Sequence, residues 1–93
     1  MSTFLIHRPG DSVGVATQDL KSGAAVIGRY RDSDKQLDLV AQDEIPLGHK
    51  VAVGDLNEGA KVIEYGVEIG VATAAIRAGQ HVHVHNLKGQ RWA

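Results

Sequence analysis

A seven-residue pattern that occurs four times constrains the fold of this 93-residue chain more than any other feature. Each copy has an aliphatic residue, a glycine three positions later and a valine three positions after that. The copies span residues 20–26, 45–51, 56–62 and 76–82. Glycine readily adopts a positive φ angle, so each copy predicts a tight turn that leads into a strand. The spacing between copies is irregular, which excludes a solenoid and favours a small barrel-like fold with many corners.

The apolar periodicity also predicts strands. Apolar and polar residues alternate over residues 37–39 and 67–69, and residues 51–53 are a further candidate strand. The polar segment 32–35 predicts a hairpin between its flanking residues 26–31 and 36–41. The eleven closely spaced glycines argue against a helical bundle. We therefore expect a mostly β, barrel-like domain of short strands with one or two helical turns, and we assign residues 1–93 to a single domain.

Composition and charge exclude several classes of protein. The 10 Lys and Arg residues are matched by 11 Asp and Glu residues, so a nucleic-acid binder or a membrane-surface binder is not expected. The absence of cysteine excludes a disulfide scaffold and a thiolate nucleophile. No apolar run approaches the ~20 residues of a transmembrane helix, and we expect a cytoplasmic protein. No acid follows Glu68, so the last quarter should attract anions, and the near-terminal Trp92 suggests a partner surface.

Three of the five histidines lie in the run His-Val-His-Val-His at residues 81–85. As a β-strand, this run would place His81, His83 and His85 on one face and both valines on the other, core-facing side. Neighbouring imidazoles would be roughly 7 Å apart, whereas His81 and His85 would be about 13 Å apart. The run therefore predicts at most two ligands for one metal ion, which we assign to His83 and His85. Proton transfer, anion binding and a solvated strand face remain open as alternatives.

The other polar residues carry weaker signals. We expect Asp11 to cap a turn, and we assign no role to His7. Ser12 has no nearby histidine that could act as a triad base, so nucleophilic catalysis is not supported. Residues 66–70 lack the strand–glycine–helix context of a phosphate loop.

Four segments together resemble a known family. They are Asp11-Ser-Val-Gly-Val-Ala16, Ile45-Pro-Leu-Gly-His-Lys-Val-Ala52, Val62-Ile-Glu-Tyr-Gly-Val-Glu-Ile-Gly70 and Ala78-Gly-Gln-His-Val-His-Val-His-Asn86. In order and spacing they are similar to the amino-terminal domain of altronate/galactarate dehydratases, over nearly the whole chain. The resemblance implies the SAF (β-clip) fold, which agrees with the short strands expected above. Ser12 departs from the asparagine more frequent in the sugar-acid dehydratases, which puts a substrate contact there in doubt.

The resemblance also implies an activity. Enzymes of this family carry out β-elimination from α-hydroxy acids with a divalent metal, Fe²⁺ or Mn²⁺. The chain ends just past the histidine run, so we expect the catalytic bulk on a separate polypeptide. This arrangement resembles sulfolactate sulfo-lyases, in which a small α subunit pairs with a large β subunit that would hold most of the metal ligands. The small subunit of a split altronate dehydratase is the alternative.

The resemblance assigns roles to six residues of this chain. His81, His83 and His85 would be catalytic at a site shared between two subunits, while His49, Lys50 and Asn86 would bind a small anionic 2-hydroxy acid. The rivals are a free-standing metal-binding protein and a non-catalytic interaction module.

Overall fold

The computed structural model describes residues 2–89 and contains only β-strands as regular secondary structure in that range. The strands are β1 (Phe4–Ile6), β2 (Val13–Ala16), β3 (Ala25–Tyr30), β4 (Gln36–Val40), β5 (Lys50–Ala52), β6 (Lys61–Glu64), β7 (Val67–Ala72), β8 (His81–Val82) and β9 (Leu87–Gly89). The mostly β prediction is confirmed: residues 2–89 contain no helix, and the expected helical turns are limited to the single turn that the N–H of Leu87 closes onto the carbonyl of His83. This range therefore contains no helix long and apolar enough to span a membrane. Trp92 lies outside the described residues.

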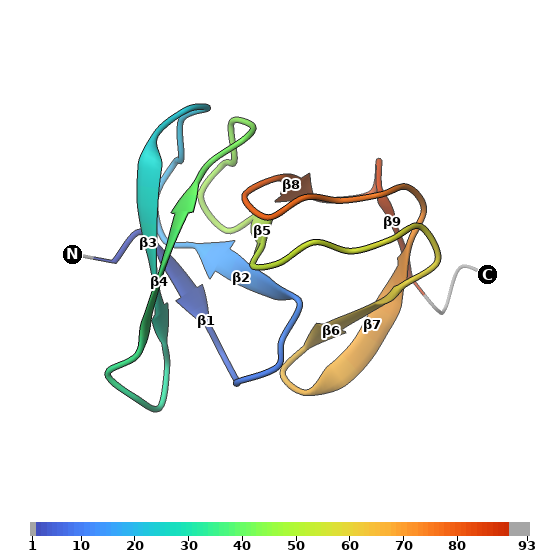
Figure 1. Cartoon of the computed structure of the whole chain (residues 1–93), viewed down its shortest axis with the longest axis horizontal. Helices are drawn as coiled ribbons and strands as arrows, with labels where there is room; N and C mark the ends of the chain where they lie inside the picture. The colour runs from blue at the N-terminus through green and yellow to red at the C-terminus, as the bar shows by residue number, and fades with distance from the viewer. Residues whose placement is uncertain (1, 90–93) are drawn as a thin grey trace.

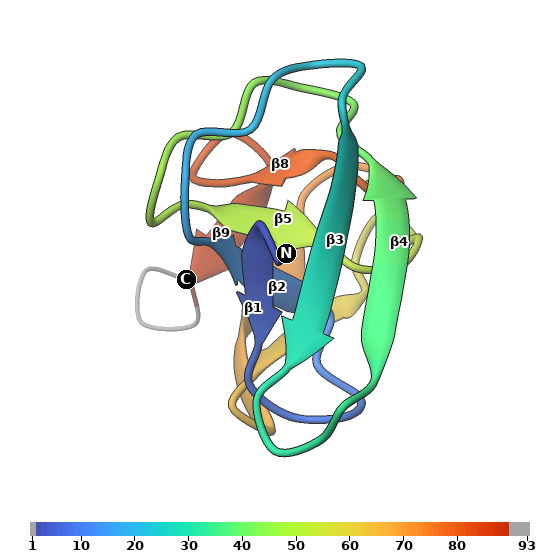
Figure 2. The same ribbon diagram turned by 90° about the vertical axis from the view of Figure 1, so that its left-hand side faces the viewer.

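The strands form two sheets. The larger has the order β4-β3-β1-β2-β5-β8 and the smaller has the order β6-β7-β9. Figure 1 shows β1, β3 and β4 at one end of the molecule and β6, β7 and β9 at the other. The predicted hairpin of β3 and β4 is confirmed, with Ala25 opposite Val40 and Arg29 opposite Gln36. Its two strands lie side by side in Figure 2. β5 and β8 lie at the other edge of the larger sheet, and the functional candidates are on these strands or directly next to them.

All four copies of the repeat form the expected turns. Their glycines have positive φ angles: Gly23, Gly48, Gly59 and Gly79. In each copy the residue after the glycine donates a backbone hydrogen bond to the residue three positions earlier, as His49 does to Pro46 at 2.9 Å and Gln80 to Arg77 at 3.0 Å. This is the hydrogen bond of a β-turn, and a positive φ favours glycine at its third position.

The structure pairs the copies in a way that the repeat alone does not predict. Leu20 and Ile45 exchange two backbone hydrogen bonds, and Leu56 and Ile76 do the same. The first copy therefore pairs with the second, and the third with the fourth. Each turn glycine also donates to the carbonyl of a buried alanine four residues before the partner copy, as Gly48 does to Ala16 at 2.8 Å.

Each pair of copies builds its own small core. The first core contains Phe4, Ile6, Ala16, Leu20, Val26, Ala41, Ile45 and Val51, and the second contains Val13, Ala52, Val62, Ala72, Ile76 and Val82. The valines that end the four copies are all buried. Val51 belongs to the first core and its strand neighbour Ala52 to the second, so β5 lies between the two cores.

Candidate functional site

The histidine run is a strand only as far as Val82. β8 ends there, and residues 83–86 form a turn in which the N–H groups of Asn86 and Leu87 both donate to the carbonyl of His83, at 3.0 and 2.9 Å. Val82 is fully buried, whereas Val84 is 69% exposed. The prediction of a continuous strand with both valines in the core was therefore wrong beyond Val82.

Asn86 explains why the strand stops. Its side-chain oxygen accepts the N–H of His83 at 2.9 Å, and its amide donates to the carbonyl of His81 at 2.8 Å. Asparagine side chains form such local bonds readily and compete in this way with strand pairing. Asn86 is only 8% exposed. The structure therefore gives its amide a part in the turn, and its predicted substrate contact stays a prediction.

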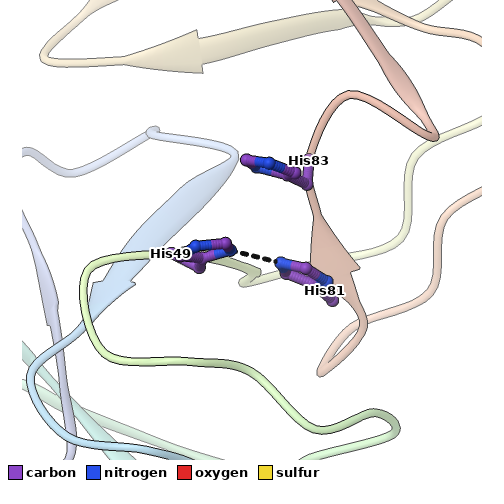
Figure 3. Close-up of side chains that lie close together, drawn as sticks. All are labelled: His49, His81 and His83. Carbon is purple, nitrogen blue, oxygen red and sulfur yellow. Dashed lines mark hydrogen bonds between the residues drawn. The ribbon is translucent and has the colours of Figure 1, made fainter.

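A second segment brings a further histidine to the run. β5 pairs antiparallel with β8, with Val51 opposite His81 and Lys50 opposite Val82. His49 precedes β5 directly, and its Nδ1 atom lies 2.9 Å from Nε2 of His81, within hydrogen-bond distance. Figure 3 shows these two rings facing each other, with His83 beside them.

Four imidazoles gather at this edge of the larger sheet. One ring nitrogen from each of His49, His81 and His83 lies within 4.8 Å of the others, and we call these three residues the histidine cluster. The ring of His83 stacks on that of His49 with the centroids 4.6 Å apart. The ring centroids of His85 and His81 are 5.3 Å apart, and the separation of about 13 Å expected for a straight strand does not apply because the strand ends at Val82. The turn bends the chain and brings both rings together.

The histidine cluster is partly open to solvent. His49 and His81 are half-buried, whereas His83 and His85 are exposed. Partial burial lowers the pKa of His81, because charging the ring there loses hydration, and the neighbouring rings of His49, His85 and His83 lower it further. The carboxylate of Asp43, which accepts the backbone N–H of His81 at 2.9 Å, raises this pKa and so offsets part of the decrease. His81 therefore favours its neutral form, in which a ring nitrogen can accept a proton or bind a metal ion.

Lys50 is not brought to the histidine cluster. Side chains alternate along β5, so Lys50 lies on the opposite face from Val51 and its partner His81. Its ammonium is 3.9 Å from the carboxylate of Glu64, and the other carboxylate oxygen is 4.0 Å from Nε2 of His7. His7 also stacks on Tyr65, with the ring centroids 3.8 Å apart. These residues form a second polar group, separate from the histidine cluster.

The donor set of the histidine cluster fits a divalent transition metal. Neutral imidazoles are ligands of Zn²⁺, Fe²⁺, Ni²⁺ and Cu²⁺, and three of them leave at least one coordination position open. The sequence analysis had placed His49 at the site as an anion-binding residue, and the structure brings its ring into the group of possible metal ligands. The repeat carried the signal, because aligning Gly48 with Gly79 places His49 and His81 within one position of each other in two copies that lead into strands.

Comparisons with known proteins identify the domain. The family profile described as the altronate/galactarate dehydratase SAF domain matches residues 2–90. A (2R)-sulfolactate sulfo-lyase subunit alpha from Chromohalobacter salexigens is 43% identical over 90 residues, which cover 96% of either chain. The subunit alpha of the same name from Paracoccus pantotrophus is 46% identical over 54 residues, which are 58% of this chain and 81% of that protein.

Longer relatives contain the same domain as a small part. The altronate dehydratase of Escherichia coli is 45% identical over 78 residues, which are 84% of this chain but 14% of the dehydratase. The family match covers all of the described residues, which contain short strands and no helix. This chain belongs to the altronate/galactarate dehydratase SAF domain family.

Proposed function

We propose that this chain is the small subunit of a two-chain, metal-dependent lyase that eliminates sulfite from (2R)-sulfolactate and yields pyruvate. The similarity to a named sulfo-lyase subunit alpha over 96% of both chains carries the proposal. The histidine cluster at the sheet edge supports it, since an elimination needs groups that bind an anion and move a proton near neutral pH. The proposed location is the cytoplasm.

The reaction removes a proton from C2 of the substrate and releases sulfite from C3, and the enol that results becomes pyruvate. A divalent metal at the site, Fe²⁺ or Mn²⁺, would polarise the substrate carboxylate and stabilise the negative charge that develops beside it. The exposure of His85 and its position next to His81 support a role for it in exchanging a proton with a substrate at the cluster. His81 and His83 would bind and orient the reacting acid, and a neutral imidazole suits either proton acceptance or metal binding.

A larger partner would complete the site. The term "subunit alpha" in the names of two relatives implies at least one further subunit. In the altronate dehydratase of Escherichia coli the matching region is 14% of the protein, so most of that enzyme lies outside this domain. We propose that a large β subunit covers the exposed side of the histidine cluster and supplies most substrate contacts. The assembly would be a hetero-oligomer.

The small subunit of an altronate dehydratase is a second candidate. The observation that favours it is the 45% identity to the Escherichia coli enzyme over 84% of this chain. The chemistry would be the same at C2, with hydroxide as the leaving group in place of sulfite. Sulfite leaves more easily, so the sulfo-lyase needs less help from a general acid.

The test combines this chain with a candidate large subunit, to be sought as a large dehydratase-like protein encoded in a neighbouring open reading frame. We expect sulfite release from sulfolactate by the complex and no turnover by either chain alone. Replacing His81 or His83 with Ala in the assembled complex should lower kcat by about 100-fold or more, because losing a group that orients the reacting acid costs roughly 10²-fold. Turnover of altronate but not sulfolactate would establish the second candidate. Turnover by this chain alone, or unchanged rates in both variants, would contradict a shared catalytic site.

A further inference from the structure

We propose that this chain by itself binds one divalent transition-metal ion through His49, His81 and His83. The site extends the proposed function but does not rest on it, because it follows from side-chain geometry within one chain. It also moves the metal from the large subunit, where the sequence analysis had expected it, to the small one. His49 takes the place of His85 among the expected ligands.

The ring nitrogens are close to the spacing that a tetrahedral metal site requires, so binding a metal would need only small movements of the side chains. In a tetrahedral site with metal–nitrogen bonds of about 2.0–2.1 Å, two ligating nitrogens are roughly 3.3 Å apart. Nδ1 of His49 and Nε2 of His81 are 2.9 Å apart, so this pair would open by only a few tenths of an ångström as the metal replaces their shared hydrogen. The ligand atoms of all three residues lie within 4.8 Å, so His83 would move inward by about 1.5 Å at most. The ring of His83 is exposed, and rotation of its side chain can supply this movement.

The backbone holds all three ligands in place. His49 follows the positive-φ Gly48, and its N–H donates to the carbonyl of Pro46 at 2.9 Å. His81 lies in the β5–β8 ladder, and the N–H of His83 is held by the Asn86 side chain at 2.9 Å. Because the backbone at these three residues is already fixed, little conformational freedom has to be lost when a metal binds.

The donor set also selects the metal. The cluster offers three imidazoles and no carboxylate, a set that favours Zn²⁺, Co²⁺, Ni²⁺ and Fe²⁺ over Mg²⁺ and Ca²⁺, which prefer oxygen ligands. The ammonium of Lys50 lies on the other face of β5, so its charge does not occupy the site. Three protein ligands leave a position for a substrate oxygen or a water molecule.

The experiment titrates the untagged 93-residue chain with Co²⁺ and follows both the visible absorption of the ion and the heat of binding. We expect one ion per chain, the strong visible bands of a four- or five-coordinate site, and no comparable binding of Mg²⁺. Replacing His49, His81 or His83 with Ala should each weaken binding at least ~10-fold, the lower range found for changes around metal sites. His85→Ala is the matched control, because it removes an exposed histidine of the same run, and His7→Ala removes one from the separate polar group. Both controls should bind within about threefold of the unchanged chain.

Circular dichroism and thermal unfolding of every variant separate loss of a ligand from loss of the fold. A folded chain that fails to bind Co²⁺ with a defined stoichiometry would overturn the metal assignment and leave the small-subunit proposal standing, with the metal on the larger chain. A loss in His85→Ala as large as that in His49→Ala would also overturn it, since His85 would then be a ligand that the proposed set of three leaves out. Binding of one ion by two chains would show that the site is shared between copies and contradict the single-chain site.

Discussion

At the scale of single residues, the surroundings of His81 affect both the stability of the fold and the protonation state of a proposed metal ligand. The residue is half-buried, accepts or donates a hydrogen bond with His49, and has the rings of His83 and His85 nearby. The loss of hydration and the nearby imidazoles lower its pKa. Only a neutral imidazole can bind a metal ion or accept a proton. The surroundings of His81 favour this form before any ligand binds.

This lowered pKa predicts a dependence of stability on pH. The unfolded chain has a histidine pKa of about 6.5, and the folded value for His81 is lower, so between the two values the unfolded state binds more protons. The contribution of His81 to the free energy of unfolding is thus fully present above about pH 6.5. It is lost as the pH falls from about 6.5 towards the pKa that His81 has in the folded chain. Urea unfolding gives the free energy of unfolding at pH 7.5 and at pH 5.5. Its decrease from the higher to the lower pH should be smaller for His81→Gln than for the unchanged chain. An equal or larger decrease in the variant would contradict this account.

At the scale of elements, close packing between strands requires glycine at particular positions, and Gly28 is one of them. Gly28 in β3 lies opposite Phe4 in β1, and a Cβ atom at Gly28 would collide with the Phe4 ring. Phe4 is fully buried in the first core. Glycine is therefore required there for space rather than for turn geometry, because the aromatic ring covers the backbone of the neighbouring strand.

Gly28→Ala should lower the free energy of unfolding by about 1–3 kcal/mol, since the Phe4 ring has to leave its position in a filled core. The matched control is Gly54→Ala, where a Cβ atom meets nothing within 4 Å. Urea denaturation of both variants measures the difference. Equal stability of the two variants would show that the core around Phe4 adapts without cost.

At the scale of the whole molecule, a short segment connects the two sheets. The Asp11 carboxylate accepts the N–H groups of Tyr65 and Gly66, both at 3.0 Å, and that of Arg8 at 3.2 Å. Ser12 next to it exchanges hydrogen bonds with Ile63 through its N–H and its hydroxyl, at 2.8 and 3.0 Å. Asp11 thus has the predicted capping role and, in addition, joins the β1–β2 connection to the β6–β7 hairpin.

Asp11→Ala should destabilise the protein by about 1–3 kcal/mol, because three backbone N–H groups lose a charged acceptor. Asp34→Ala, in the exposed turn between β3 and β4, is the control and should change stability by less than about 0.5 kcal/mol. Thermal unfolding reports both effects. A loss no greater in Asp11→Ala than in Asp34→Ala would mean that water replaces the carboxylate at no cost.

Much of the fold was predictable because its rules are local. Gly48 and Gly79 mark turns through their own backbone preference, and the residues 32–35 mark a hairpin through polar composition alone. Reasoning by alternation failed at His83–Asn86, where an asparagine side chain competes with strand pairing. Alternation describes which face a residue takes within a strand but contains no information on where the strand ends.

The candidate site shows the same division. The sequence by itself determined the four turns, the mostly β character and the presence of a histidine run at a strand, because these depend on neighbours within a few residues. Only the tertiary structure decided that His49 joins His81 and His83 while the adjacent Lys50 pairs with Glu64. That choice depends on the register of β5 against β8, which two distant segments establish together when they bury Val51 and Val82 in separate cores. A one-residue shift of that register would exchange the faces of His49 and Lys50, and no local pattern specifies it.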